Sequence, residues 1–144
     1  MRTLLVLTIL LGIPFASRAQ SPFGAIHERT DEVTNLFQGD HRQIVHREFY
    51  PIVNSAQTTC AFRLERGVTY SVIVVGDGDR ILDINGSVYD AQGALVGADA
   101  DSANLSIVEV TPPVTQQYTV CASGGRFAAE ANEAHFAILI VRMN

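Results

Sequence analysis

Calcium binding is the first chemistry that the acidic residues of this chain suggest. Aspartates gather in one stretch of the sequence, between Gly76 and Ser102. Because calcium prefers several carboxylate and carbonyl oxygens, these acids are its candidate ligands. The predicted ligands are Asp77, Asp79, Asp83, Asp99 and Asp101, and the neighbouring Asn85 can add an amide oxygen. The spacing is not that of an EF-hand. The alternative is that these acids form turns on a solvated rim, and no other cofactor is predicted.

Catalytic patterns are missing from the rest of the sequence. His41 and His46 are too far apart for a metalloprotease His-Glu-x-x-His helix, and no cysteine spacing completes a structural zinc site. The Gly-x-Ser-x-Gly elbow of serine hydrolases does not occur either. The sequence therefore predicts a protein that is not an enzyme.

Aromatic residues that could form a binding platform are few. The chain has no tryptophan and 4 tyrosines. Tyr89 is the main candidate, because Val88 alternates inward with Ile84 and leaves Tyr89 on the opposite side of its strand. The alternative is an ordinary cross-strand aromatic contact.

The N-terminus predicts export. Arg2 precedes the apolar run Leu4 to Phe15, and Ser17-Arg-Ala19 places small residues where a signal peptidase cuts. Residues 1–19 are therefore a predicted signal peptide, and the protein is expected to be secreted or periplasmic. The apolar run is shorter than the ~20 residues that a membrane-spanning helix needs, so no membrane insertion is expected.

Charge and cysteine content fit an exported protein. The formal net charge of −5 argues against nucleic acid as a partner. Cys60 and Cys121 predict a disulfide in an oxidising compartment. One detail disagrees: strict alternation places Cys60 with Phe62 on one face but puts Cys121 opposite Val120. A β-bulge would reconcile the pair, and two separate buried thiols are the alternative.

Short strands separated by Gly, Pro and Asp turns dominate residues 36–144. About eight of them are expected, so the predicted fold is all-β, an antiparallel sandwich of jelly-roll type. A barrel is the alternative. Residues 20–35 show no clear period and are predicted to be a flexible lead or one helical turn. Alternation assigns these residues to the core: Phe62, Leu64, Tyr70, Val72, Val74, Ile84, Val88, Val108, Val110, Tyr118, Val120, Ile138 and Ile140.

Several motifs resemble the bacterial pre-peptidase C-terminal domain family. They are an amphipathic strand ending at Gly67, the Tyr70 strand, the acidic turn at residues 76–79, Val88-Tyr-Asp-Ala-Gln-Gly93, and the segment from Thr111 to Val120. The chain departs from the family at Asp83-Ile-Asn-Gly86, where the usual motif is Asp-Leu-Asp-Leu. The resemblance implies a jelly-roll-like sandwich that serves as an accessory module of secreted peptidases.

These observations predict an exported, non-catalytic module. Its expected partner is an exported protein or a cell-envelope polymer, bound through a sheet face or the acidic loops. The resemblance implies an alternative role, as an accessory subunit, inhibitor or chaperone partner of a secreted peptidase.

Overall fold

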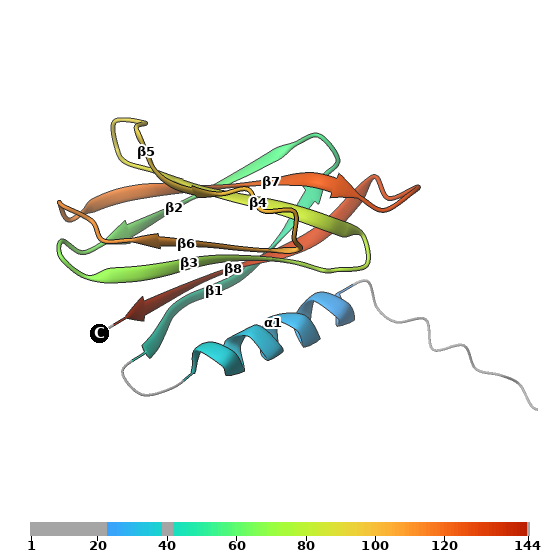
Figure 1. Ribbon diagram of the computed structural model, residues 1–144, viewed down its shortest axis with the longest axis horizontal. Helices are drawn as coiled ribbons and strands as arrows, with labels where there is room; N and C mark the ends of the chain where they lie inside the picture. Colours follow the sequence, from blue (N-terminus) through green and yellow to red (C-terminus); the bar gives the residue numbers. More distant parts are fainter. Residues whose placement is uncertain (1–22, 39–41, 144) are drawn as a thin grey trace, which may run out of the picture.

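In the part of the chain that the structure describes, eight β-strands form two antiparallel sheets, as the sequence predicts (Figure 1). The computed structural model describes residues 23–38 and 42–143. The predicted signal peptide, residues 1–19, and His41 lie outside the described residues. The strands are β1 (Arg42–Val53), β2 (Gln57–Leu64), β3 (Thr69–Gly76), β4 (Ile81–Tyr89), β5 (Leu95–Asp99), β6 (Leu105–Val110), β7 (Gln116–Phe127) and β8 (Glu133–Met143).

The strand order confirms the jelly roll. One sheet has the order β1-β8-β3-β6 and the other has the order β2-β7-β4-β5. The antiparallel pairs β1 with β8, β2 with β7, β3 with β6 and β4 with β5 are nested within one another. This nested pairing is the arrangement of a double-sheet jelly roll. Below, the two sheets are called the β8 sheet and the β7 sheet.

The main core lies between the two sheets. It contains every position that alternation assigned to it, and Val72, Val88 and Ile138 are fully buried. Among the predicted positions Phe62 alone is only partly buried, because it lies on the edge strand β2. The alternation of apolar and polar residues therefore decides which side of each strand faces the core.

A helix covers the outer face of the β8 sheet and adds a third layer (Figure 1). This helix, α1, runs from Gly24 to Phe37. The predicted flexible lead over residues 20–35 is therefore wrong for residues 24–35. Ile26 and Val33 pack against Ile73 and Leu139, so β3 is buried on both faces.

Helix α1 depends on its tertiary contacts. Its buried side chains Ile26, Thr30 and Val33 recur with helical spacing, but two threonines among the four buried positions weaken the apolar pattern. The first residue, Gly24, follows Phe23, which provides no side-chain cap. Because an isolated helix of this length is marginal in water, packing on the β8 sheet must stabilise it.

Two aromatic contacts anchor the first turns of the helix. Phe23 packs on His135 with ring centroids 4.2 Å apart, and His27 packs on Phe49 at 4.1 Å.

Within residues 23–38 and 42–143, no helix is long and apolar enough to cross a membrane.

Candidate functional site

The predicted calcium ligands lie in the β3–β4 loop, on β4 and at the end of β5, and two of them accept hydrogen bonds from backbone amides. Asp77 is buried, and its Oδ1 accepts hydrogen bonds from the amides of Arg80 and Ile81 at 2.8 and 3.0 Å. Asp99 accepts the amide of Asp101 at 3.1 Å and that of Ile107 at 2.7 Å. Both carboxylates thus serve the turn-forming role that was the alternative to calcium.

The remaining acids do not complete a metal site in the described part of the chain. Asp79 and Asp101 are exposed, whereas Asp83 lies on β4 beside Gly125. The Oδ1 atoms of Asp83 and Asn85 are buried without a hydrogen-bond partner. Across residues 23–38 and 42–143, no three His, Cys, Asp or Glu side chains lie close enough to share a metal ion. Calcium binding stays a prediction.

The predicted disulfide between Cys60 and Cys121 is wrong. The two cysteines lie on neighbouring strands, but Cys60 pairs with Val120 and Cys121 pairs with Thr59. Successive side chains of a strand point to opposite faces, so Cys60 packs against the core while Cys121 lies on the outer face. Both thiols are free, and the disagreement in alternation is the physical reason.

Both thiols should therefore react without prior reduction. We expect the unfolded protein to take up iodoacetamide at both cysteines in the absence of reductant. In the native protein, Cys121 should react more slowly than Cys60, because Cys121 is only 8% exposed and burial raises the pKa of its thiol. Since the thiolate is the nucleophile, its rate should climb as the pH rises. Mass spectrometry of the alkylated peptides tests this, and a mass gain that requires reductant would indicate a bridge.

A polar cluster that sequence analysis missed lies between the edge strands β1 and β2. The Tyr50 hydroxyl donates a 2.7 Å hydrogen bond to Glu48 Oε2, and His46 Nε2 lies 3.5 Å from the same oxygen. Cys60, on the facing sheet, adjoins Tyr50. His46, Glu48 and Tyr50 occupy alternate positions of β1, so the period of a strand was the signal that places them on one side.

This cluster is held together by a hydrogen bond from the Tyr50 phenol to Glu48. Burial raises the pKa of Tyr50, and the neighbouring Cys60 and Glu48 raise it further. The phenol therefore stays protonated and donates to Glu48. The thiol of Cys60 lies beside this protonated phenol. A protonated phenol cannot accept the thiol proton, so it does not activate Cys60 as a nucleophile.

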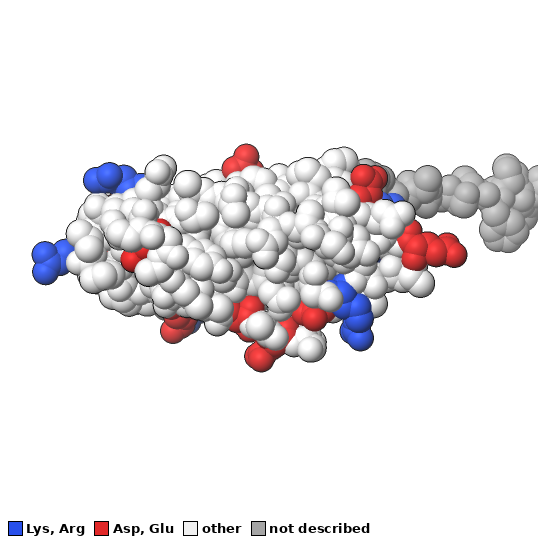
Figure 2. Space-filling model, turned by 90° about the horizontal axis from the view of Figure 1, so that it is seen from above, with Lys and Arg blue, Asp and Glu red and all other residues white. Residues whose placement is uncertain are grey.

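The outer face of the β7 sheet is open, and charged side chains surround it (Figure 2). The view in Figure 2 is from the top of Figure 1, where β2, β7, β4 and β5 lie. Acidic and basic side chains lie mainly along the margin, and the middle is free of them. The other outer surface, that of the β8 sheet, is covered by α1.

Strand register identifies the residues in the middle of this open face. They form three cross-strand rows: Thr59, Cys121, Ser87 and Ala98; Ala61, Thr119, Tyr89 and Leu95; Gln57, Ser123 and Asn85. No charged residue occurs in these rows. Arg63 on β2 lies beyond one end of the rows, and the pair of Asp83 and Arg126 lies beyond the other. We call these three rows the open face.

Tyr89 lies on the open face, on the side of β4 that the sequence predicted. Val88 is fully buried in the core, whereas Tyr89 is half-buried and its hydroxyl lies 3.5 Å from Ser87 Oγ. Its cross-strand neighbour Leu95 is 59% exposed. The two side chains place an apolar contact area at one end of a face that is otherwise rich in hydroxyl and amide groups.

Comparison with known proteins does not assign this chain to a family. No family model matches the chain, and no curated protein sequence matches it. The resemblance to the pre-peptidase C-terminal domain family stays a prediction from the sequence motifs. Function must therefore be argued from the residues and their arrangement.

Proposed function

We propose that this chain is an exported, non-catalytic β-sandwich module that binds a protein or a cell-envelope polymer through the open face. The observation that supports it is the contrast between the two outer surfaces. Helix α1 packs on the outer face of the β8 sheet, while the middle of the β7 sheet presents uncharged side chains to solvent. The open face is thus the sheet surface on which a partner can pack.

The composition of the open face fits binding. Burying an unpaired charge is costly, so the centres of protein interfaces are depleted of charged residues. Thr59, Ser87 and Thr119 supply hydroxyl groups, and Gln57 and Asn85 supply amides for hydrogen bonds. Tyr89 and the exposed Leu95 supply apolar area at one end.

The proposed compartment rests on the predicted signal peptide at residues 1–19, with the periplasm and the extracellular space as its two destinations. Acidity of the chain disfavours nucleic acid as the partner. The accessory, inhibitor or chaperone role beside a secreted peptidase is the second proposal. It rests on the family resemblance, and it predicts that the captured partner is a peptidase.

A charge placed on the open face should abolish binding. Thr119 lies on β7, between Ala61 and Tyr89, in the row of the open face nearest to Arg63. In Thr119→Arg, partner binding would bury an unpaired guanidinium, and we expect capture to fall by about tenfold or more. The purified protein is immobilised and incubated with the exported fraction of its host, and the captured protein and sugar are then quantified by mass spectrometry and sugar analysis.

The matched control introduces the same charge on the opposite layer. Asn35 is exposed on α1, so Asn35→Arg should retain capture. Equal capture by both variants and by the original protein would contradict the open face as the binding surface. Captured envelope polymer or a non-peptidase protein supports the first proposal, and captured peptidase supports the second.

A further inference from the structure

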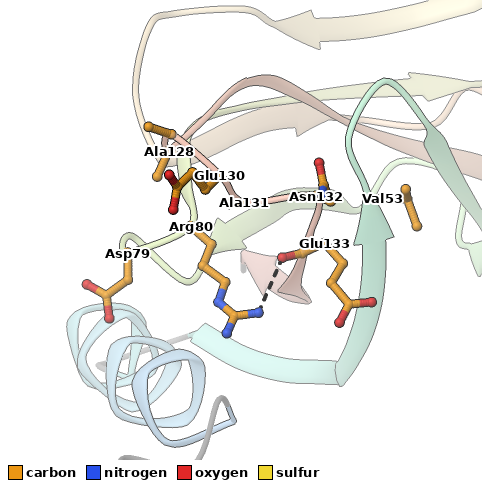
Figure 3. Close-up of a pocket in the computed structure, with 9 residues that line it drawn as sticks. Val53, Asp79, Arg80, Ala128, Glu130, Ala131, Asn132 and Glu133 are labelled. Carbon is orange, nitrogen blue, oxygen red and sulfur yellow. Dashed lines mark hydrogen bonds between the residues drawn. The ribbon is translucent and has the colours of Figure 1, made fainter.

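A pocket of about 560 Å³ lies at one end of the sandwich, away from the rows of the open face (Figure 3). Such a volume is within the usual range for small-ligand sites. Three separate segments build it: the end of β1, the β3–β4 loop and the β7–β8 connection. The lining residues are Val53, Asp79, Arg80 and the run from Ala128 to Glu133.

Backbone hydrogen bonds fix the walls of this pocket. The Ala128 amide donates to the Arg80 carbonyl at 2.8 Å, and the Asn54 amide donates to the Asn132 carbonyl at the same distance. Glu130 has a φ of 68°, in the left-handed region that glycine or asparagine adopts more readily. This conformation belongs to the turn that is closed at the pocket wall by the 3.1 Å hydrogen bond from the Ala131 amide to the Ala128 carbonyl.

Arg80 supplies the positive charge of the pocket. Its Nη1 donates only a long hydrogen bond, 3.5 Å, to the carbonyl oxygen of Glu133. The ion pairs of the described residues do not include Arg80, so no carboxylate in that part of the chain lies within 4.0 Å of its guanidinium. Figure 3 shows the Arg80 side chain between Asp79 and Glu133, whose carboxylates flank it on two sides.

We propose that this pocket binds a short peptide through its free amino and carboxyl termini. Arg80 binds the terminal carboxylate through its paired N–H groups, the mode of recognition that suits a guanidinium. The carboxylate of Glu133, on one side of Arg80, attracts the terminal ammonium group. Together with Asp79 and Glu130 it would repel a simple anion, and Arg80 would repel a simple cation.

The size and lining of the pocket define the peptide further. The guanidinium and the carboxylates are more than 4.0 Å apart, so a ligand must separate its two charges. A dipeptide separates its termini by about 7 Å when extended. The methyl groups of Ala128, Ala129 and Ala131, together with Val53, provide an apolar lining for small side chains.

Titration with dialanine tests this proposal. The purified protein is titrated while the amide resonances of residues 128–133 are followed by NMR, and we expect saturable shifts there. N-acetyl-dialanine and dialanine amide each lack one terminal charge, so each should bind about tenfold more weakly or worse. Arg80→Gln and Glu133→Gln should each weaken dialanine by a similar factor, because each removes one of the charges that hold the ligand.

Controls separate this site from the open face. Arg63→Gln removes an arginine from β2 and should leave dialanine binding unchanged, as should Thr119→Arg. The thermal midpoint of each variant establishes that it folds, and the blocked peptides test the unaltered protein directly. Absence of saturable shifts, or equal binding of dialanine and its blocked forms, would overturn the proposal without affecting the function proposed for the open face.

Discussion

Replacing Ile26 by alanine should lower the free energy of unfolding by about 2–4 kcal/mol. Ile26 lies on the face of α1 that packs against the β8 sheet, where it is fully buried in the cluster that includes Ile73, Ala137 and Leu139. The substitution removes apolar contacts and leaves a cavity between helix and sheet. Because α1 has no side-chain cap at Phe23 and gains its stability from packing, part of its helical signal should be lost as well.

Leu36→Ala is the matched control for this substitution. Leu36 lies in the same helix but is 76% exposed, so its truncation should change the free energy of unfolding by less than about 0.5 kcal/mol. Urea unfolding followed by far-ultraviolet circular dichroism measures both variants. Equal and negligible effects would mean that residues 24–37 behave as the flexible lead that the sequence suggested.

Replacing Gly86 by leucine, the residue of the resembled family motif, should destabilise the fold by about 1–3 kcal/mol or more. Gly86 lies on β4 and faces the core, where a Cβ atom would be 2.6 Å from Ser106 Oγ and 3.1 Å from Val74 Cγ2. The two sheets approach closely at this point, so a large side chain cannot fit without separating them. Chemical denaturation measures the loss.

A double-mutant cycle identifies the contact responsible. Gly86→Ala alone should cost about 1–2 kcal/mol through overpacking against the Ser106 hydroxyl. In the Ser106→Ala background the cost should shrink, because Ser106 Cβ would lie 3.4 Å from the new methyl group, an ordinary contact distance. An unchanged cost would show that Val74 or the backbone, rather than Ser106, limits the space.

The strands and the core between them follow from the sequence alone. Ile84 and Val88 alternate with polar neighbours, and the run from Val72 to Val75 is apolar at every position, so strand and burial are readable without a structure. Turn residues such as Gly67 and Gly93, both at positive φ, mark where the strands end. These signals are local, which is why they predicted about eight strands and the inward side of β2, β3, β4, β6, β7 and β8.

Helix α1 and the cysteines were decided by tertiary structure. Thr30 and Thr34 interrupt the apolar stripe of the helix, but both are buried against the β8 sheet, and the Thr30 hydroxyl donates to the Ile26 carbonyl at 2.6 Å. Cys60 and Cys121 suggested a bridge by their number and compartment. The register of β2 against β7 places them on opposite faces, and no rule of composition contains that register.

The candidate sites depend even more on long-range pairing. Thr59, Ser87 and Thr119 share the open face because β2, β4 and β7 are neighbours in one sheet, although they are far apart in the chain. Arg80 reaches Glu133 because a jelly roll brings its loops to the same end of the sandwich. The sequence determined which side chains each strand presents, through the two-residue period of extended backbone. Only the pairing of distant strands, which maximises burial of both sheets, decided which of those side chains meet.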